Sequence, residues 1–156
     1  MKLRQLRSLT FVFVLVAVAA IVLAGTALAG RLDGSDQGGR TIVVEMTGAA
    51  ERPGPGDPDG SGTAWFTFNY GQSEVCFVLE VANIAPATAA HIHVAPVTDP
   101  GPVVIGLTAP TSGTSSGCVS ADQDLIKAIV QNPENYYVNV HNADFPPGAV
   151  RGQLSK

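Results

Sequence analysis

The residues best suited to chemistry in this chain are its three histidines. One residue separates His91 from His93, and His141 ends a second strand-like run, residues 136–141. On an extended strand, alternate residues face the same side, so His91 and His93 would lie about 6–7 Å apart while Ile92 points into the core. A third imidazole from a neighbouring strand would complete a three-nitrogen site suited to Cu(II) or Zn(II).

Two interpretations of these histidines stay open at this point. In the first they bind copper or zinc, and Tyr137 and Asn139, on the same strand face as His141, form hydrogen bonds to the ligands. In the second they are structural, and their ring nitrogens bond loop carbonyls or the carboxylates of Asp99 or Asp144. Three imidazoles outside the cytoplasm also collect adventitious metal, so affinity alone does not decide between the two.

Arg151 is a further residue for which a specific interaction is expected. It is the only charged residue in the closing apolar run, residues 149–154, and it follows a turn rich in proline. An isolated arginine in a strand usually pairs with a carboxylate, such as that of Asp144 or Glu80. The sequence predicts an ion pair between Arg151 and Asp144 that fixes this turn beside His141.

The elements that would position these side chains are mostly strands. Short β-branched or alternating apolar runs lie between Pro- and Gly-containing turns, and they cover residues 41–47, 63–70, 74–82, 90–94, 103–107, 136–141 and 149–154. One segment has helical spacing, with a capping box at Ser120 and Gln123 and a stop at Asn132–Pro133. Some seven strands and one short helix in a connection predict an all-β fold, an antiparallel β-sandwich or Greek-key barrel.

Three local expectations complete this outline. Residues 48–62 contain three prolines and predict a long exposed loop. Residues 108–118, rich in Gly, Ser and Thr, predict a second loop that runs to Cys118. Alternation places Tyr70 on the same buried side as Phe68, and it places Trp65 on the more polar side.

The first 29 residues have the pattern of a secretory signal peptide. Three basic residues precede an apolar run over residues 9–23, and residues 27–29 form the small-x-small pattern that signal peptidase recognises. The apolar run is almost long enough to cross a bilayer, so an uncleaved N-terminal anchor is the alternative. In both cases the rest of the chain is predicted to be secreted or extracytoplasmic, with contact to a membrane only if the leader is kept.

The remainder divides into a flexible tether, residues 30–40, and one domain, residues 41–156. Without the leader, the chain carries six basic and 13 acidic residues, a net charge of −7. Because the chain is anionic and has no basic cluster, we expect no binding to nucleic acid.

Cys76 and Cys118 are the only cysteines in the chain. The compartment implied by the leader permits disulfides, so we predict one Cys76–Cys118 bridge. Closing a loop of this size would stabilise the fold by roughly 4 kcal/mol on the chain-entropy estimate. Two free thiols are the alternative, and a two-thiol metal or redox site is disfavoured because no C-x-x-C spacing exists.

Several stretches, in the same order, resemble the CHRD domain, a module named after chordin. They are Pro-x-x-Ala-Ala-His-Ile-His (86–93), Gly-Pro-Val-Val (101–104), the run Asn-Pro-x-x-Tyr-Tyr-Val-Asn-Val-His (132–141) and the closing residues 145–154. The resemblance implies an extracellular β-sandwich of immunoglobulin-like or superoxide-dismutase-like character with no established enzymatic activity. The His-x-His run is also similar to the paired copper-binding histidines of copper-zinc superoxide dismutase.

Two functions follow from the residues and the resemblance. The first is a secreted, non-catalytic binding or structural module that recognises an extracellular protein or envelope polymer. The second is an extracytoplasmic copper- or zinc-binding domain that uses His91, His93 and His141, with superoxide-dismutase-like chemistry as an extension. We expect no enzyme of the common classes, because the chain has no G-x-S-x-G elbow, no H-E-x-x-H helix and no Gly-rich phosphate loop.

Overall fold

The computed structural model describes residues 39–156. The predicted leader, residues 1–29, and most of the predicted tether lie outside the described residues. The strands are β1 (Arg40–Thr47), β2 (Ser61–Asn69), β3 (Glu74–Ala82), β4 (Ala87–Val94), β5 (Val103–Leu107), β6 (Thr114–Ser120), β7 (Tyr136–Asn142) and β8 (Val150–Gln153). One α-helix, α1 (Gln123–Gln131), and three 3-10 helices, η2 (Gly48–Ala50), η3 (Tyr70–Gln72) and η4 (Pro133–Asn135), complete the described part.

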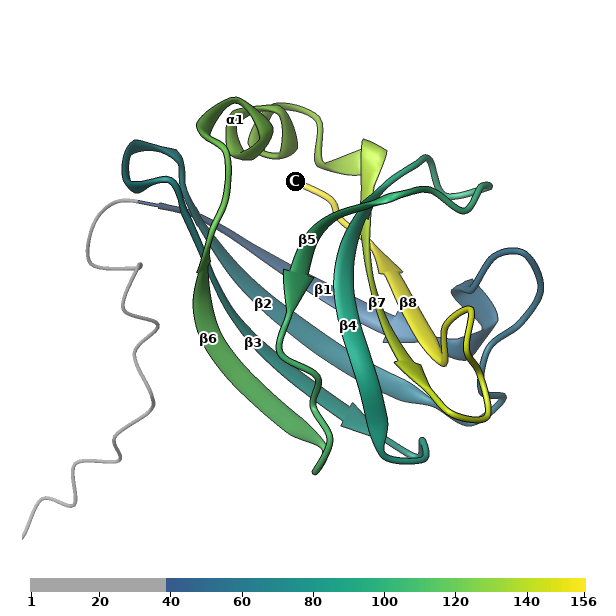
Figure 1. Cartoon of the computed structure of the whole chain (residues 1–156). Helices are drawn as coiled ribbons and strands as arrows, with labels where there is room; N and C mark the ends of the chain where they lie inside the picture. Colours follow the sequence, from purple (N-terminus) through teal and green to yellow (C-terminus); the bar gives the residue numbers. More distant parts are fainter. Residues whose placement is uncertain (1–38) are drawn as a thin grey trace, which may run out of the picture.

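All eight strands belong to one antiparallel sheet with the order β5-β4-β7-β8-β1-β2-β3-β6. The sheet curls until its edge strands, β5 and β6, approach each other, which gives a nearly closed barrel (Figure 1). The Ser115 hydroxyl of β6 donates a hydrogen bond of 2.7 Å to the carbonyl of Thr108, just after β5. The predicted all-β antiparallel sandwich or barrel is thus confirmed, and the structure takes the barrel form.

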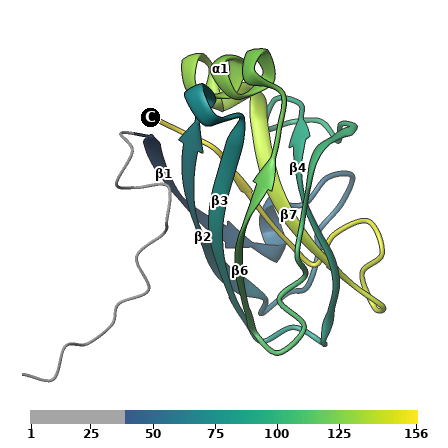
Figure 2. The same cartoon turned by 60° about the vertical axis from the view of Figure 1, so that its left-hand side comes forward.

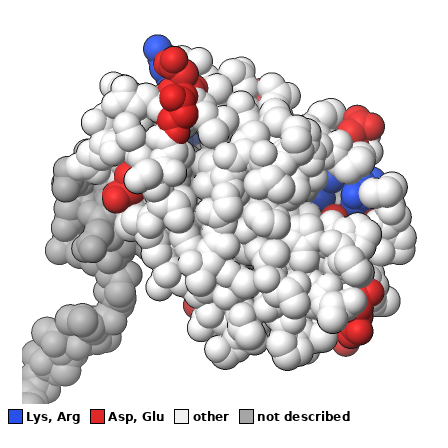
Figure 3. All heavy atoms as spheres, in the orientation of Figure 1, with Lys and Arg blue, Asp and Glu red and all other residues white. Residues whose placement is uncertain are grey.

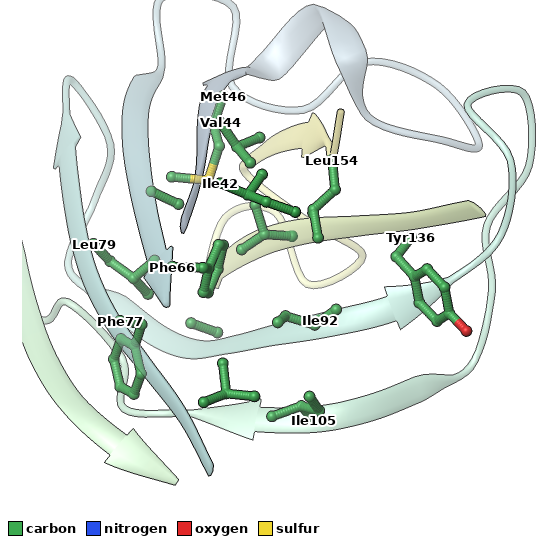
Figure 4. Packing of buried hydrophobic residues seen from close by; sticks show 14 of the residues in the cluster. Ile42, Val44, Met46, Phe66, Phe77, Leu79, Ile92, Ile105, Tyr136 and Leu154 are labelled. Carbon is green, nitrogen blue, oxygen red and sulfur yellow. The ribbon is translucent and has the colours of Figure 1, made fainter. Parts of the chain in front are cut away.

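Alternate residues of the strands fill the barrel. Phe66 of β2 is directly opposite Ile42 of β1 on one side and Phe77 of β3 on the other, and all three side chains point into the core (Figure 4). From the opposite wall, Ile92 of β4 is likewise fully buried. The buried cluster also includes Val44, Met46, Ala64, Phe68, Val75, Leu79, Ala90, Ile105, Tyr136, Val138, Val140, Val150 and Leu154.

The helix α1 covers one end of the barrel (Figures 1 and 2). Ile126 and Ile129 point from it into the core and are fully buried. Its N-cap is Asp122, whose Oδ1 accepts hydrogen bonds from the backbone N–H groups of Asp124 and Leu125. The predicted capping box at Ser120 is therefore wrong, because Ser120 is still paired in β6. No helix within residues 39–156 has the length and apolarity to span a membrane.

The strand β6 begins inside the segment predicted to be a loop and takes up its second part, residues 114–118. It pairs with β3 along its whole length, from Glu74↔Ser120 to Glu80↔Thr114. Ser and Gly have low strand propensity, so the composition of this segment does not predict a strand. Pairing with β3 stabilises it instead. Cys76 and Cys118 are directly opposite each other in this pair, with Cα atoms 3.9 Å apart, and the predicted disulfide joins them.

The loop of residues 48–60 differs in part from its prediction, because Gly48, Glu51, Gly56 and Gly60 are buried although residues 53–55 are exposed. Its Gly56 N–H donates to the Gly48 carbonyl within the loop, and its Asp57 N–H donates to the carbonyl of Ala149, just before β8. The loop therefore lies against the turn of residues 143–149. A second difference concerns Tyr70, which leaves β2 for η3 and is 61% exposed.

Candidate metal centre

The three histidines lie together on the outer face of the barrel, over β4 and β7. In the register of this strand pair, His91 is opposite Asn139, His93 is opposite Tyr137, and His141 is opposite Ala89. Both histidines of β4 point outward because Ile92 between them points into the core. One ring nitrogen from each histidine lies within 4.8 Å of the other two. The spacing argument thus holds, and the third imidazole comes from the adjacent strand.

Hydrogen bonds to two loop carbonyls assign the tautomers of two imidazoles. His93 Nδ1 lies 2.8 Å from the carbonyl oxygen of Gly101, and His141 Nδ1 lies 2.9 Å from that of Pro146. A carbonyl only accepts, so each Nδ1 carries the proton and each Nε2 presents a lone pair. His91 Nδ1 lies 3.1 Å from His141 Nε2 and donates to it.

The second nitrogen of His93 has no such partner. His93 is 7% exposed, and its Nε2 is buried without any hydrogen bond among the described residues. A buried acceptor left unpaired is unfavourable by roughly 1–3 kcal/mol, so this atom requires an explanation. The centroid of the His93 ring lies 5.5 Å from that of His91 and 6.2 Å from that of His141. The three rings therefore surround one small region.

Electrostatics keep the exposed edge of this cluster neutral. Burial lowers the pKa of His91, and the neighbouring imidazoles of His141 and His93 lower it further. Burial likewise lowers the pKa of His141, and His93 adds to this, although the hydrogen bond to Pro146 acts in the opposite direction. Neutral imidazole is the form that binds a metal ion, so both shifts favour ligation near neutral pH.

The comparison with known families can now be set against this geometry. The model of the CHRD domain matches residues 42–154. The chain belongs to the CHRD domain family. Neither a curated protein nor a solved structure matches it. In this CHRD domain the stretches that carry the resemblance form β4, the start of β5, β7 and β8, which are adjacent strands, so they build the histidine cluster and its surroundings.

Tyr137 lies at the centre of a stack of side chains on the outer face of this CHRD domain. The His93 ring is parallel to it, with a centroid distance of 4.7 Å and an interplanar angle of 7°. The Arg151 guanidinium carbon lies 3.5 Å from the centroid of the Tyr137 ring. Because β7 is between β4 and β8, His93 and Arg151 cover opposite faces of the ring. Tyr137 therefore contacts a candidate ligand by stacking. The predicted hydrogen bonds from Tyr137 and Asn139 to the histidines are absent among the described residues, because the Tyr137 hydroxyl accepts from Gly101 N–H and Asn139 Nδ2 donates to Pro147 O.

The predicted ion pair between Arg151 and Asp144 is wrong. The Arg151 guanidinium, 1% exposed, donates to the carbonyl oxygens of Asp99 and Pro96 and to Gln153 Oε1. Arg151 is on the outward side of β8, where the chain following β4 covers it, so backbone carbonyls reach it first. Burial lowers the pKa of the guanidinium, and Tyr137 and Glu51 raise it.

Those carbonyls belong to residues 95–102, which we call the strap. The strap lies across the outer side of β4, β7 and β8, and five hydrogen bonds hold it there. Arg151 bonds two of its carbonyls, Gln153 Nε2 donates to Ala95 O, His93 Nδ1 donates to Gly101 O, and Gly101 N–H donates to the Tyr137 hydroxyl oxygen. The strap therefore both buries His93 and orients its ring.

A glutamate that the sequence analysis did not single out packs against Gly148, in the turn that contacts His141. Glu51, in the loop 48–60, is 3% exposed, and its Oε1 has no hydrogen-bond partner. Burial raises the pKa of this carboxyl to about 7, although hydrogen bonds to Arg52 and Asn139 and the charge of Arg151 lower it. Nothing in the local sequence around this glutamate, which is rich in proline and glycine, predicts that it is buried. Its burial results from the packing of its loop against the turn 143–149.

Proposed function

We propose that this CHRD domain is an extracytoplasmic metal-binding module that holds one Cu(II) or Zn(II) ion. The ligands are His91 Nδ1, His93 Nε2 and His141 Nε2. The lone pairs of His91 Nδ1 and His141 Nε2 become available once the His91–His141 hydrogen bond breaks and neutral His91 carries its proton on Nε2 instead of Nδ1. The ion, when bound, supplies positive charge and an open coordination position. The CHRD domain is not a known catalytic family, and the proposed module acts by binding.

The unpartnered His93 Nε2 is the observation that carries this proposal. A purely structural histidine would have both nitrogens satisfied or one of them exposed to water. Here Nδ1 is fixed by Gly101, Nε2 is buried without a partner, and a ring nitrogen of His93 lies within 4.8 Å of one from each of the other two imidazoles. An ion would satisfy it.

The distances within the cluster agree with a shared ligand. Two nitrogens bound to one tetrahedral ion at about 2.0–2.1 Å are about 3.3–3.4 Å apart. His91 Nδ1 and His141 Nε2 are 3.1 Å apart, so an ion would replace their hydrogen bond after a separation of a few tenths of an ångström. The carbonyls of Gly101 and Pro146 hold the remote nitrogens of His93 and His141, which is how ligand imidazoles are usually oriented.

The location of the module follows from two observations. CHRD domains are extracellular, and the Cys76–Cys118 disulfide is suited to an oxidising compartment. Secretion through the leader of residues 1–29 is part of the proposal. Recognition of an extracellular protein or envelope polymer and superoxide-dismutase-like chemistry stay predictions, to be tested once the metal content is known.

Calorimetric titration of the purified full chain with Cu(II) and with Zn(II) tests the proposal. We expect one ion per chain with a Kd of about 1 µM or lower. In the triple variant His91→Ala/His93→Ala/His141→Ala, affinity should fall at least 100-fold. Glu45→Ala, which removes an exposed carboxylate from β1, is the control and should bind as the unmodified chain does.

Two results would reject the metal site. Absence of binding to the unmodified chain would leave the histidines as structural residues. Binding that the triple variant retains would identify an adventitious site elsewhere. Electron paramagnetic resonance of the Cu(II) form provides an independent reading, because three nitrogen ligands split the copper signal and the triple variant should lose that splitting.

A further inference from the structure

Glu51 is the one deeply buried acidic group in the described part of the chain, and it packs against the turn that orients His141. Its carboxyl lies against the Cα of Gly148, where any Cβ would overlap Oε1. Gly148 has φ of +154°, which residues with a side chain rarely adopt. The absence of a side chain therefore permits both this backbone conformation and the contact with Glu51. Replacement of Gly148 by a larger residue would expel the carboxyl.

The turn of residues 143–149 depends on side chains from β7. Pro146 O accepts from His141 Nδ1, Pro147 O accepts from Asn139 Nδ2 at 3.4 Å, and the Phe145 N–H donates to Asn142 Oδ1. Glu51 supports the same turn from the other side. A displacement of Gly148 moves Pro147 and Pro146 with it, and Pro146 is the group that fixes the His141 ring.

The surroundings of Glu51 satisfy a carboxylate only in part, since the hydrogen bonds from Arg52 and Asn139 leave Oε1 without a donor. Its Oε1 and Asn139 Oδ1 are both buried acceptors without a donor. The charged groups that face it are Arg151 of β8 and its neighbour Arg52, and β7 presents the uncharged Asn139. The Arg52 guanidinium donates instead to the carbonyls of Ala49 and Glu51, and that of Arg151 donates to the strap and Gln153. A proton on Glu51 would supply a missing donor.

We propose that Glu51 is a positioning residue that controls the turn 143–149 by its protonation: the neutral acid stays packed against Gly148, and the carboxylate leaves for water and releases the turn. The pKa of about 7 that burial gives this group agrees with control near neutral pH. The effect on metal affinity rests on the function proposed above, since it acts through His141. The effect on the turn itself needs no metal.

Hydrogen–deuterium exchange of the metal-free full chain tests the effect on the turn. The reporters are the N–H groups of Phe145, Gly148 and Ala149, which donate within the turn or to β7. After correction for intrinsic exchange, opening should increase about tenfold from pH 6 to pH 8, because the open form releases the Glu51 proton more readily. Glu51→Gln should make opening independent of pH, and Glu45→Gln should keep the dependence of the unmodified chain.

Two further readouts separate positioning from simple loss of packing. Glu51→Ala should alter the ¹⁵N signals of the His141 ring, because Pro146 no longer selects the Nδ1–H tautomer, and should weaken Cu(II) or Zn(II) binding at pH 6 about 10- to 100-fold. Glu51→Gln should restore both the ring signals and the affinity. Rescue by the glutamine is not expected of a residue that acts through its charge.

The outcomes distinguish the two proposals. Opening that does not change with pH in the unmodified chain, or that still changes in Glu51→Gln, would overturn the role of Glu51. An unaltered His141 signal in Glu51→Ala would also overturn it. If exchange behaves as expected but no variant binds metal, the metal site is rejected and the control of the turn by Glu51 stands.

Discussion

The outer surface of the barrel has two faces, both formed by the alternate, outward-pointing residues of adjacent strands. They differ in how far their side chains are exposed to solvent. We call the outward residues of β4, β7 and β8 the histidine face and those of β1, β2 and β3 the tryptophan face. On the histidine face, the outward Tyr137, Asn139 and Arg151 are no more than 3% exposed. On the tryptophan face, Val43, opposite Trp65, is 50% exposed. Polar side chains of the first face are thus covered, whereas an apolar side chain of the second is half exposed.

This difference identifies the histidine face as the surface that other segments of the chain cover. Burying polar groups is unfavourable unless each finds a partner, and an arginine is rarely buried completely. Three segments nevertheless cover the histidine face: the strap, the loop 48–60 and the turn 143–149. They supply backbone carbonyls to His93, His141 and Arg151. In Figure 3 most of the visible surface is uncharged, and a group of basic atoms lies in one recess near the right-hand edge.

Removal of Arg151 from the histidine face should lower the stability of the chain more than any other substitution that we propose. Arg151→Ala deletes three hydrogen bonds and the contact with the Tyr137 ring, and it leaves carbonyls of the strap unpaired. We expect the free energy of unfolding to fall by about 3 kcal/mol or more, with a Tm lower by about 10 °C. Urea denaturation measures it. Arg40→Ala, an exposed position in β1, should change stability by less than about 0.5 kcal/mol; equal losses would contradict the argument.

The buried carboxyl of Glu51 should give the histidine face an unusual pH dependence. Its pKa rises from 4.5 to about 7 on folding, so the folded chain binds more protons between these values. The contribution of Glu51 to stability is therefore full below about pH 4.5 and falls by about 3 kcal/mol as pH rises to about 7. The difference in unfolding free energy between the unmodified chain and Glu51→Gln, measured from pH 4 to 8, should follow this curve. A difference constant with pH would contradict it.

The histidines should act in the opposite direction and more weakly. The pKa values of His91 and His141 are lowered from 6.5 in the folded metal-free chain, so the unfolded chain binds more protons below about pH 6.5. Stability from these groups is present above that pH and falls as pH decreases through the lowered values. The double variant His91→Gln/His141→Gln should lose this decline, in thermal melts from pH 7.5 to 5. A decline retained in full would assign it to other groups.

A substitution on the tryptophan face should have the smallest effect. Val43→Ser changes an exposed side chain whose outward neighbours are already partly in water. We expect a change below about 0.5 kcal/mol in urea denaturation and no change in metal affinity. Loss of more than about 2 kcal/mol would mean that this face is covered in solution, and the contrast between the faces would then disappear.

The local pattern of alternating residues and flanking turns was sufficient to predict most strands of the barrel. The predicted strands at 74–82 and 103–107 have the same bounds as β3 and β5, because alternation and flanking turns define them within the segment itself. The strand β6 was missed, since its pairing with β3 and its disulfide stabilise residues with little strand propensity. The helix was found, but its cap was placed two residues early.

The candidate site was predictable only where strand geometry determines it. The common face of His91 and His93 follows from their spacing, and pairing of β4 with β7 adds His141. The carbonyls of Gly101 and Pro146 come from loops, whose paths the periodicity of the strands does not determine. For the same reason Arg151 was given the wrong partner, and Glu51 was overlooked.

The seam between β5 and β6 has a consequence for the behaviour of this CHRD domain on heating. The three imidazoles are carried by β4 and β7, which are neighbours in the sheet, whereas the seam is one strand away from β4. The backbone positions of the three histidines therefore depend on the hydrogen bonds of a single strand pair. An opening of the barrel at this seam on heating would therefore leave the pair β4–β7, and the histidine cluster on it, in place.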